Sequence, residues 1–296
     1  MPRRSRLALI AALLATSCTA TADQSAELVG SFAWEKSNEA FFGFSGIEVS
    51  DDGASFVIIG DSSQVITGHL ERNGAGRIAS VVVETVSSLR ASDGSDIRGT
   101  PFEDAEGLTA LPGGGFAVSF EGAHRVNLYP EIDAPAKPLP LARAFGALQT
   151  NAGLEALAVD GDGTLYALPE RSGGLMEDFP VFRYRDGTWD VPFTVTRGGG
   201  FLPVGADFGP DGSFYLLERQ FLGVLGFSTR VRRYSIDGER IGGGEVILHT
   251  AARTHDNLEG LSVWRDSRGD IRLTMVSDNN NLPVQTTEIV EYRLRE

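Results

Sequence analysis

Cysteine is nearly absent from this chain, which has Cys18 as its single cysteine among 296 residues. Cys18 lies in an N-terminal segment that we expect to be processed, so the folded body would contain no cysteine. This excludes disulfide bonds, zinc sites built from thiolates and a cysteine nucleophile. Histidine is also scarce, and its four copies show no metal-ligand spacing: His69, His124, His249 and His255.

Positive charge is scarce as well. The chain has 26 Lys and Arg against 40 Asp and Glu, which gives a formal net charge of -14 and a pI near 4.8. Surfaces that bind nucleic acids are basic, so this balance excludes a general nucleic-acid partner. A phosphate-rich ligand would need a cation to bridge it to so acidic a protein.

Long apolar runs are missing except near the N-terminus. Arg3, Arg4 and Arg6 precede an apolar run over residues 7–15. This order is typical of a secretory signal, and the run is too short to span a bilayer. We therefore expect an exported protein, periplasmic or secreted, with no membrane span.

Two processing routes are open for this segment. The small residues at 20–22 predict cleavage of a signal peptide of residues 1–22. Alternatively, "LATSC" at 14–18 resembles a lipobox, which would make 1–17 a lipoprotein signal. Cys18 would then carry a lipid anchor, and the protein would be a membrane-anchored lipoprotein.

Helical periodicity is absent, and five hairpin-like segments take its place. Each has an alternating strand, a Gly-rich turn that usually contains Asp-Gly, an apolar run and an acidic residue. The segments are "GIEVSDDGASFVIIGD" (46–61), "EGLTALPGGGFAVSFE" (106–121), "EALAVDGDGTLYALPE" (155–170), "GADFGPDGSFYLLE" (205–218) and "EGLSVWRDSRGDIRLTMVSD" (259–278). One small residue recurs at equivalent positions, 49 to 61 residues apart: Gly46, Gly107, Ala156, Gly205 and Gly260.

Two further strand-like runs follow most of these hairpins, which gives four strands per repeat. The last repeat has only three, and "ELVGSFAWEK" at 27–36 offers the fourth. We predict a single all-β domain over residues 23–296: a β-propeller of five four-stranded blades, closed by pairing the N- and C-terminal strands. Six blades are the alternative, if the 61-residue first repeat contains an additional blade.

The repeat also predicts where acidic residues meet. Residues before the first strand and after the second strand of a hairpin lie at the same end, and the first strand of each blade lines the channel. We therefore expect these residues at one channel mouth: Asp61, Asp104, Glu106, Glu121, Glu155, Glu170, Glu218, Asp256, Glu259, Asp278 and Asn279. Glu48 and Asp207 lie within first strands, and their direction stays open.

Such a ring of carboxylates needs a cation, because like charges repel more strongly where water is excluded. Oxygen ligands without thiolates favour Ca²⁺, then Mg²⁺ or Mn²⁺. Glu106 or Glu259 would act as general base, and Arg171 or Arg219 would hold an anionic ester. Alternatively, the acids cap loops and the arginines pair with neighbouring acids.

Several short motifs resemble one known family. "DAEG" at 104–107, "NAGLEAL" at 151–157, "DNLEGL" at 256–261 and "SDNNN" at 277–281, with "ER" at 170–171 and 218–219, are similar to the phytase-like domain of exported bacterial proteins, described as having esterase-like activity. The resemblance implies a β-propeller and, by analogy with β-propeller phytases, calcium and phosphate-ester chemistry. Ala156 and Val204 depart from the Glu-Gly pattern of the motif.

The functional prediction is thus an exported, monomeric, calcium-binding propeller hydrolase with a small anionic ester as substrate. Calcium-dependent lactonases of the gluconolactonase and paraoxonase type are also similar in their channel residues. A propeller of the cell envelope that binds a partner without catalysis, with structural calcium, is the third interpretation.

Overall fold

The part of the chain that the computed structural model describes comprises residues 25–34, 41–174, 176–282 and 284–295. The predicted signal segment, including Cys18, lies outside the described residues. Within the described ranges, no helix is long and apolar enough to cross a membrane.

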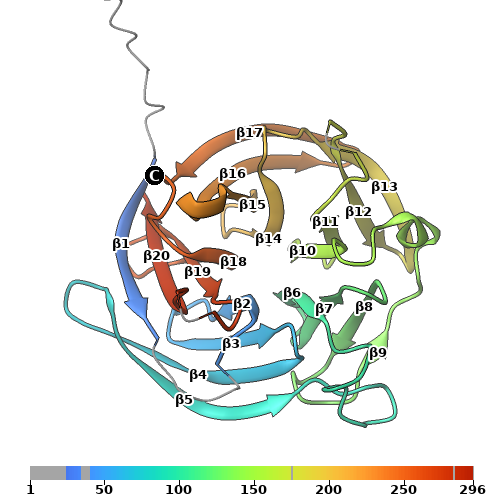
Figure 1. Cartoon of the computed structure of the whole chain (residues 1–296), viewed down its shortest axis with the longest axis horizontal. Helices are drawn as coiled ribbons and strands as arrows, with labels where there is room; N and C mark the ends of the chain where they lie inside the picture. The colour runs from blue at the N-terminus through green and yellow to red at the C-terminus, as the bar shows by residue number, and fades with distance from the viewer. Residues whose placement is uncertain (1–24, 35–40, 175, 283, 296) are drawn as a thin grey trace, which may run out of the picture.

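The described residues form five four-stranded antiparallel sheets, arranged as blades around a central axis (Figure 1). This confirms the all-β, five-bladed propeller, and the alternative of six blades is not realised. The long first repeat contains two long outer strands and the loop that follows them.

Four blades run along the chain from their inner to their outer strand. Blade 1 consists of β2 (Phe44–Val49), β3 (Ser55–Gly60), β4 (Gln64–Arg72) and β5 (Ile78–Ser88). Blade 2 consists of β6 (Ala105–Ala110), β7 (Phe116–Phe120), β8 (Arg125–Tyr129) and β9 (Lys137–Pro138). Blade 3 consists of β10 (Leu154–Val159), β11 (Leu165–Pro169), β12 (Phe179–Arg185) and β13 (Thr188–Val195). Blade 4 consists of β14 (Leu202–Phe208), β15 (Phe214–Phe221), β16 (Phe227–Asp237) and β17 (Arg240–His249). Two 3-10 helices are η1 (Arg143–Ala147) and η2 (Gly223–Leu225).

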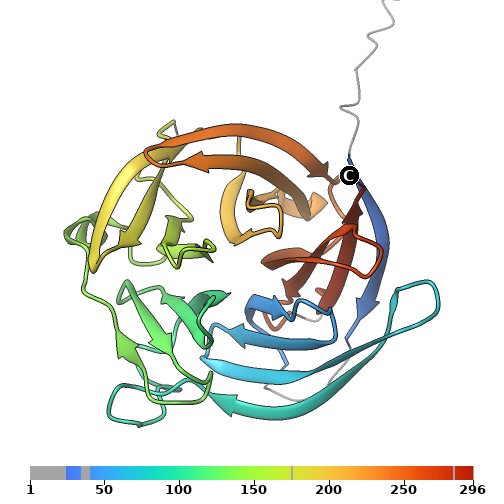
Figure 2. The same cartoon turned by 180° about the vertical axis from the view of Figure 1, so that it is seen from behind.

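Blade 5 closes the ring with strands from both ends of the chain. It consists of β18 (Asn257–Arg265), β19 (Ile271–Asp278), β20 (Glu288–Leu294) and, outermost, β1 (Ala26–Ala33). β1 and β20 are antiparallel, with Ala26 opposite Leu294, and they lie side by side at the edge of the ring in Figures 1 and 2. The predicted closure is therefore confirmed.

The Asp-Gly turns join the inner two strands of three blades. Gly53, Gly163 and Gly212 all have positive φ, between 72° and 85°, a conformation that glycine adopts without a steric penalty. In blade 1, the N–H of Gly53 donates to the carbonyl of Ser50 at 2.7 Å. These turns lie at the end of the channel opposite the predicted acidic mouth.

The apolar core lies between neighbouring blades. Side chains alternate along each strand, so a sheet can present apolar residues to the blades on both sides. Between blades 5 and 1, the rings of Trp34 and Phe44 lie 5.7 Å apart and pack with Phe56 and Trp264. This packing fixes the angle between blades and so positions the inner strands.

The inner strands are held so close together that the channel is plugged. A Cβ added at Gly46 would lie 2.8 Å from the Cβ of Leu108, and one at Gly107 would lie 2.6 Å from the Cβ of Leu157. The recurring glycine thus permits this close approach. The remaining space, about 10 Å³, is roughly the volume needed for one water molecule. The plug separates the two ends of the channel.

Candidate active site at the channel mouth

A bulge in every inner strand directs one residue toward the channel mouth. In each of the five pairings, the inner strand has one residue more than its partner just before the recurring small residue. Such bulges reorient a side chain without ending the strand. The residues placed there, which we call the inner ring, are Ser45, Glu106, Glu155, Val204 and Glu259.

A second set of equivalent residues lies at or near the end of the second strand of each hairpin. The strand registers make them equivalent. In each blade, the last inner-strand residue before the bulge pairs with a residue of the second strand, and the residue directly after that partner belongs to this set. We call this set the outer ring: Asp61, Glu121, Glu170, Arg219 and Asp278. Blade 4 has no acid in either ring, with Val204 and Arg219 at the two positions, and blade 1 has Ser45 in the inner ring.

Glu218 does not belong to the outer ring, which corrects the placement expected from the sequence. It pairs with Pro203, one position before Arg219, so its side chain leaves the opposite face of β15. There its fully buried carboxylate accepts hydrogen bonds from Arg230 Nε at 2.8 Å and from Arg232 Nη2 at 2.6 Å. Glu218 therefore joins two strands of blade 4 and is not available to a cation at the mouth.

The three glutamates of the inner ring repel one another. Burial, followed by the charges of Glu155 and Glu259, raises the pKa of Glu106 well above its ordinary value. Burial, followed by the charges of Glu170 and Glu259, also raises the pKa of Glu155 well above its ordinary value. The three carboxylates therefore need protons or a cation to share this space.

Blade 2 offers the clearest cation site. One carboxylate oxygen from each of Asp104, Glu106 and Glu121 lies within 4.8 Å of the other two. Oxygen ligands lie 2.3–2.6 Å from Ca²⁺, so two ligands of one ion are at most about 5 Å apart. These three residues can therefore hold a divalent cation. Burial raises the pKa of Glu121 to about 7, a cost that a bound cation would offset.

Arg219 balances the opposite side of the mouth. Its Nη1 donates to Asn257 Oδ1 at 2.5 Å and also to Glu259, while Nη2 donates to Glu170 Oε1 at 3.3 Å. Burial lowers the pKa of Arg219, but Glu259, Glu155 and Glu170 together raise it above its ordinary value. Arg219 is thus a fixed cation between blades 3 and 5.

Other predicted residues have local partners. Asp278 accepts from the N–H groups of Gly43 at 3.1 Å and Asn280 at 2.7 Å, and burial raises its pKa to about 6. Asp61 accepts from Ser62 Oγ at 2.9 Å, and burial raises its pKa too.

Asp256 and Asn279 shape a loop, as in the alternative interpretation of the acids. Asp256 accepts from the N–H of Thr286 at 2.7 Å and from Gln285 Nε2 at 2.9 Å. The side-chain oxygen of Asn279 accepts from the N–H of Asn281 at 3.0 Å. Both residues hold the loop between β19 and β20 against the mouth.

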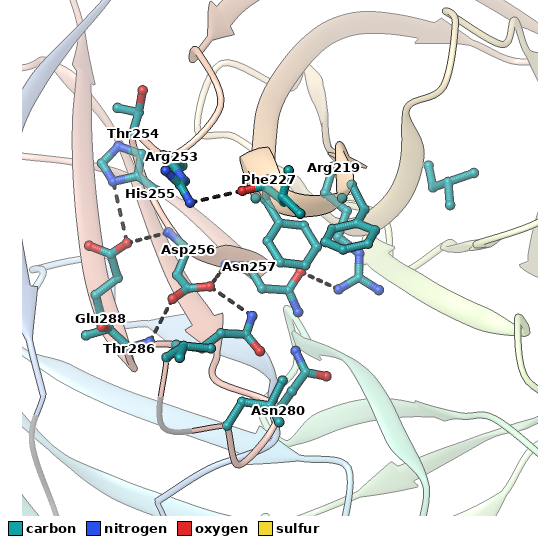
Figure 3. Close-up of a pocket in the computed structure, with 18 of the residues that line it drawn as sticks. Arg219, Phe227, Arg253, Thr254, His255, Asp256, Asn257, Asn280, Thr286 and Glu288 are labelled. Atoms are coloured by element: carbon teal, nitrogen blue, oxygen red, sulfur yellow. Dashed lines mark hydrogen bonds and ion pairs between the residues drawn. The ribbon is translucent and has the colours of Figure 1, made fainter.

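A cavity of about 930 Å³ opens beside Arg219, between blades 4 and 5 (Figure 3). Its inner wall includes Arg219, Glu170 and Asn257, so it shares residues with the ring. Figure 3 shows Arg219 facing Asn257 next to the ring of Phe227. Arg171, predicted to hold an anion, also lines this cavity, with its side chain 56% exposed and 3.4 Å from Glu170.

Glu48 and Asp207 lie at the other end of the channel, beyond the plug. Glu48 accepts from the N–H of Ala110 at 2.8 Å and from Ser262 Oγ at 3.2 Å. Asp207 accepts from the N–H of Val263 at 2.6 Å. Burial raises the pKa of Glu48 to about 7. These acids brace inner strands together and do not join the candidate site.

Sequence reasoning missed one residue of the site, Asn257, and placed Glu218 rather than Arg219 in the ring, although both features had readable signals. Glu121 lies 14 residues after Gly107, and Glu170 lies 14 after Ala156; the same count from Gly205 reaches Arg219 rather than Glu218. Asn257 connects Arg219 to Glu259, because its Nδ2 donates to Glu259 Oε1 at 2.9 Å. It precedes Glu259 in the motif "DNLEG".

Five blades around a plugged channel, with carboxylates at one mouth that can hold a divalent cation, define a β-propeller with a candidate metal site. A family model described as "Phytase-like: Esterase-like activity of phytase" matches residues 39–281. The chain therefore belongs to the phytase-like family, which confirms the resemblance seen in its motifs. No curated protein matches the chain.

Solved structures share the architecture at low identity. An α-L-arabinofuranosidase from Podospora anserina is 9% identical, with a TM-score of 0.52, over 88% of this chain and 93% of the other. A regucalcin described as a calcium-binding protein, from Agrobacterium tumefaciens, is 12% identical, with a TM-score of 0.49, over 86% and 92%. A gluconolactonase from Xanthomonas campestris is 12% identical, with a TM-score of 0.44, over 85% and 86%. The likeness to the arabinofuranosidase concerns the fold alone.

Proposed function

We propose that this protein is an exported, calcium-binding hydrolase that acts on a phosphate ester or another anionic ester. The observation that carries the proposal is the joint placement of a carboxylate cluster and an arginine at one mouth. Asp104, Glu106 and Glu121 supply oxygen ligands. Arg219 lines a ligand-sized cavity and donates to Glu259, whose charge acts on Glu106. Membership of the phytase-like family supports ester chemistry.

Each residue has a separate role in this proposal. Asp104, Glu106 and Glu121 would hold Ca²⁺, which when bound polarises an ester oxygen and lowers the pKa of coordinated water. Arg219 donates toward an anionic group of the substrate. Glu259 already accepts from Arg219 and Asn257, so it positions the guanidinium.

The choice of general base follows from this assignment. With Glu259 engaged by Arg219 and Glu106 assigned to the cation, the base falls to Glu155, the neighbouring carboxylate of the inner ring. Burial and the neighbouring charges raise the pKa of the Glu155 carboxyl, and a raised pKa brings a base nearer to the operating pH. Cation binding would lower this pKa again, which keeps the base ionised at neutral pH.

The test combines metal analysis with a substrate panel. Purified protein should bind Ca²⁺ in isothermal titration calorimetry and hydrolyse one or more of p-nitrophenyl phosphate, p-nitrophenyl acetate, phytate and simple lactones in millimolar Ca²⁺. Glu106→Gln should abolish both properties, whereas Glu245→Gln, an exposed acid on β17, should change neither. Hydrolysis of lactones alone would favour the lactonase interpretation. Calcium binding without hydrolysis of any substrate would leave a non-enzymatic binding propeller.

A further inference from the structure

The cavity beside Arg219 has an apolar outer rim formed by two loops. Val224, at the tip of the β15–β16 loop, is 88% exposed, and Val284, in the β19–β20 loop, is 87% exposed. Phe221 and Leu282 are exposed beside them, and all four residues line the cavity. Exposed apolar residues gathered around one opening are a mark of a binding site in a soluble protein.

Both loops are held in place by specific hydrogen bonds. In the first loop, the N–H of Leu222 donates to Gly226 O at 2.8 Å, and Arg253 Nη2 donates to Val224 O at 2.9 Å. In the second loop, the N–H of Leu282 donates to Asn279 O at 2.8 Å. The Asp256 carboxylate anchors the same loop through Thr286. These hydrogen bonds therefore hold the exposed apolar residues of the two loops in defined positions.

The polarity of the cavity changes from its inner wall to its rim. Arg219 and Asn257 stand at the inner wall, where the channel mouth begins, and the Phe227 ring lies next to them (Figure 3). Toward the solvent, the walls become Phe221, Val224 and the β19–β20 loop. A volume of about 930 Å³ is near the upper end of the range for small-molecule sites, roughly 300–1,000 Å³.

We propose that this cavity binds an amphiphilic ester: a single anionic or ester head at Arg219, with an apolar chain lying against Val224, Leu282 and Val284. The inference rests on the proposed hydrolase function and names its substrate class. A polyanion such as phytate fits less well at Arg219, because carboxylates surround that guanidinium. Arg171 and Arg253 also line the cavity, so phytate is the competing ligand in the test.

The binding test uses straight-chain alkanesulfonates, which are monoanions and cannot be hydrolysed. Isothermal titration calorimetry with butane-, hexane- and octanesulfonate, below micelle-forming concentrations and with Ca²⁺ present, should show affinity rising about three- to fourfold per methylene. Val224→Ser combined with Val284→Ser should flatten this dependence. Val191→Ser, an exposed valine on β13 away from the cavity, is the matched control and should leave it unchanged.

The outcomes separate this inference from the proposed function. Equal affinities for all chain lengths, or tighter binding of phytate than of octanesulfonate, would overturn the proposal that the cavity binds an amphiphilic ester. Self-association in light scattering that the double valine variant abolishes would assign the rim to a contact between copies and also overturn it. Chain-length-dependent binding without ester hydrolysis would uphold this inference and overturn only the hydrolase.

Discussion

Blades 2 and 4 have the same backbone plan but present different chemistry at the mouth. Both have a bulge before the recurring glycine, and in both the outer-ring residue comes directly after the residue of the second strand that pairs just before the bulge. Blade 2 places Glu106 on the inner ring and Glu121 on the outer ring. Blade 4 places Val204 and Arg219 at those two positions.

The difference shows that the repeat fixes positions and that single residues at those positions set the chemistry. In blade 2, carboxylates lie within reach of one cation. In blade 4, the guanidinium of Arg219 compensates the charges of Glu170 in blade 3 and Glu259 in blade 5. Val204 takes the place of an inner-ring carboxylate. The cavity opens next to the blade that departs from the pattern.

The largest expected effect comes from removing the guanidinium of blade 4. Arg219→Gln would leave Glu259 and Glu170 without their cation, and removing one partner of a buried ion pair costs about 3–5 kcal/mol. We expect the free energy of unfolding, measured by urea denaturation with EDTA at pH 7.5, to fall by about 4 kcal/mol.

Arg185→Gln is the matched control for this experiment. Arg185 is half exposed, and its acidic partners lie 3.8–3.9 Å away. Loss of such a surface pair changes stability by less than about 1 kcal/mol. A fall for Arg219→Gln as small as that of the control would show that Arg219 does not balance the ring.

Glu218→Gln sharpens the comparison, because it tests the register that separates Glu218 from Arg219. Arg230 and Arg232 would lose their buried carboxylate, so unfolding should become easier by about 3 kcal/mol. Calcium affinity should stay unchanged, since Glu218 faces away from the mouth. A loss of calcium affinity in titration calorimetry, without a loss of stability, would return Glu218 to the ring.

The fold could be predicted from the sequence because its signals are local and repeated. Asp-Gly turns mark hairpins, the small residue recurs at an equivalent position in each repeat, and the missing fourth strand of the last repeat points to the N-terminus. These features depend on backbone geometry, which each repeat expresses alone. Agreement among five repeats also compensated for the irregular length of the first.

The site was predictable only in part, because side-chain direction depends on register to a single residue. A slip of one position moves a side chain to the other face of its strand, and this is the error that brought Glu218 into the predicted ring. The bulges that aim Glu106, Glu155 and Glu259 leave no mark in the composition of the strand. The cavity depends on two loops far apart in the sequence, so spacing could not indicate it.

The pH dependence of stability tests the acidic side of the comparison. Burial raises the pKa of Glu121 and of Glu259 to about 7, so between pH 5 and 7 the folded protein binds more protons than the unfolded chain. Stability of the calcium-free protein should therefore fall as pH rises through this window, by about 1–3 kcal/mol. Thermal melts at pH 5, 6, 7 and 8 with EDTA would measure it, and saturating Ca²⁺ should flatten the trend. A rise in stability with pH over this range would contradict the assignment.

The smallest expected effect, and the most specific, is on the cation itself. Glu121→Gln removes one of the three blade 2 carboxylates but retains an oxygen that can accept the hydrogen bond from the N–H of Gly153, now 3.0 Å from Glu121 Oε1. The fold should therefore persist, while calcium affinity falls by at least about tenfold, the lower end of the effect of losing even an outer partner of a metal site. Glu131→Gln, an exposed acid of the same blade, should leave affinity unchanged in the same titration. Equal affinities in the two variants would place the cation among the inner-ring glutamates, and blade 2 would then differ from blade 4 in charge but not in function.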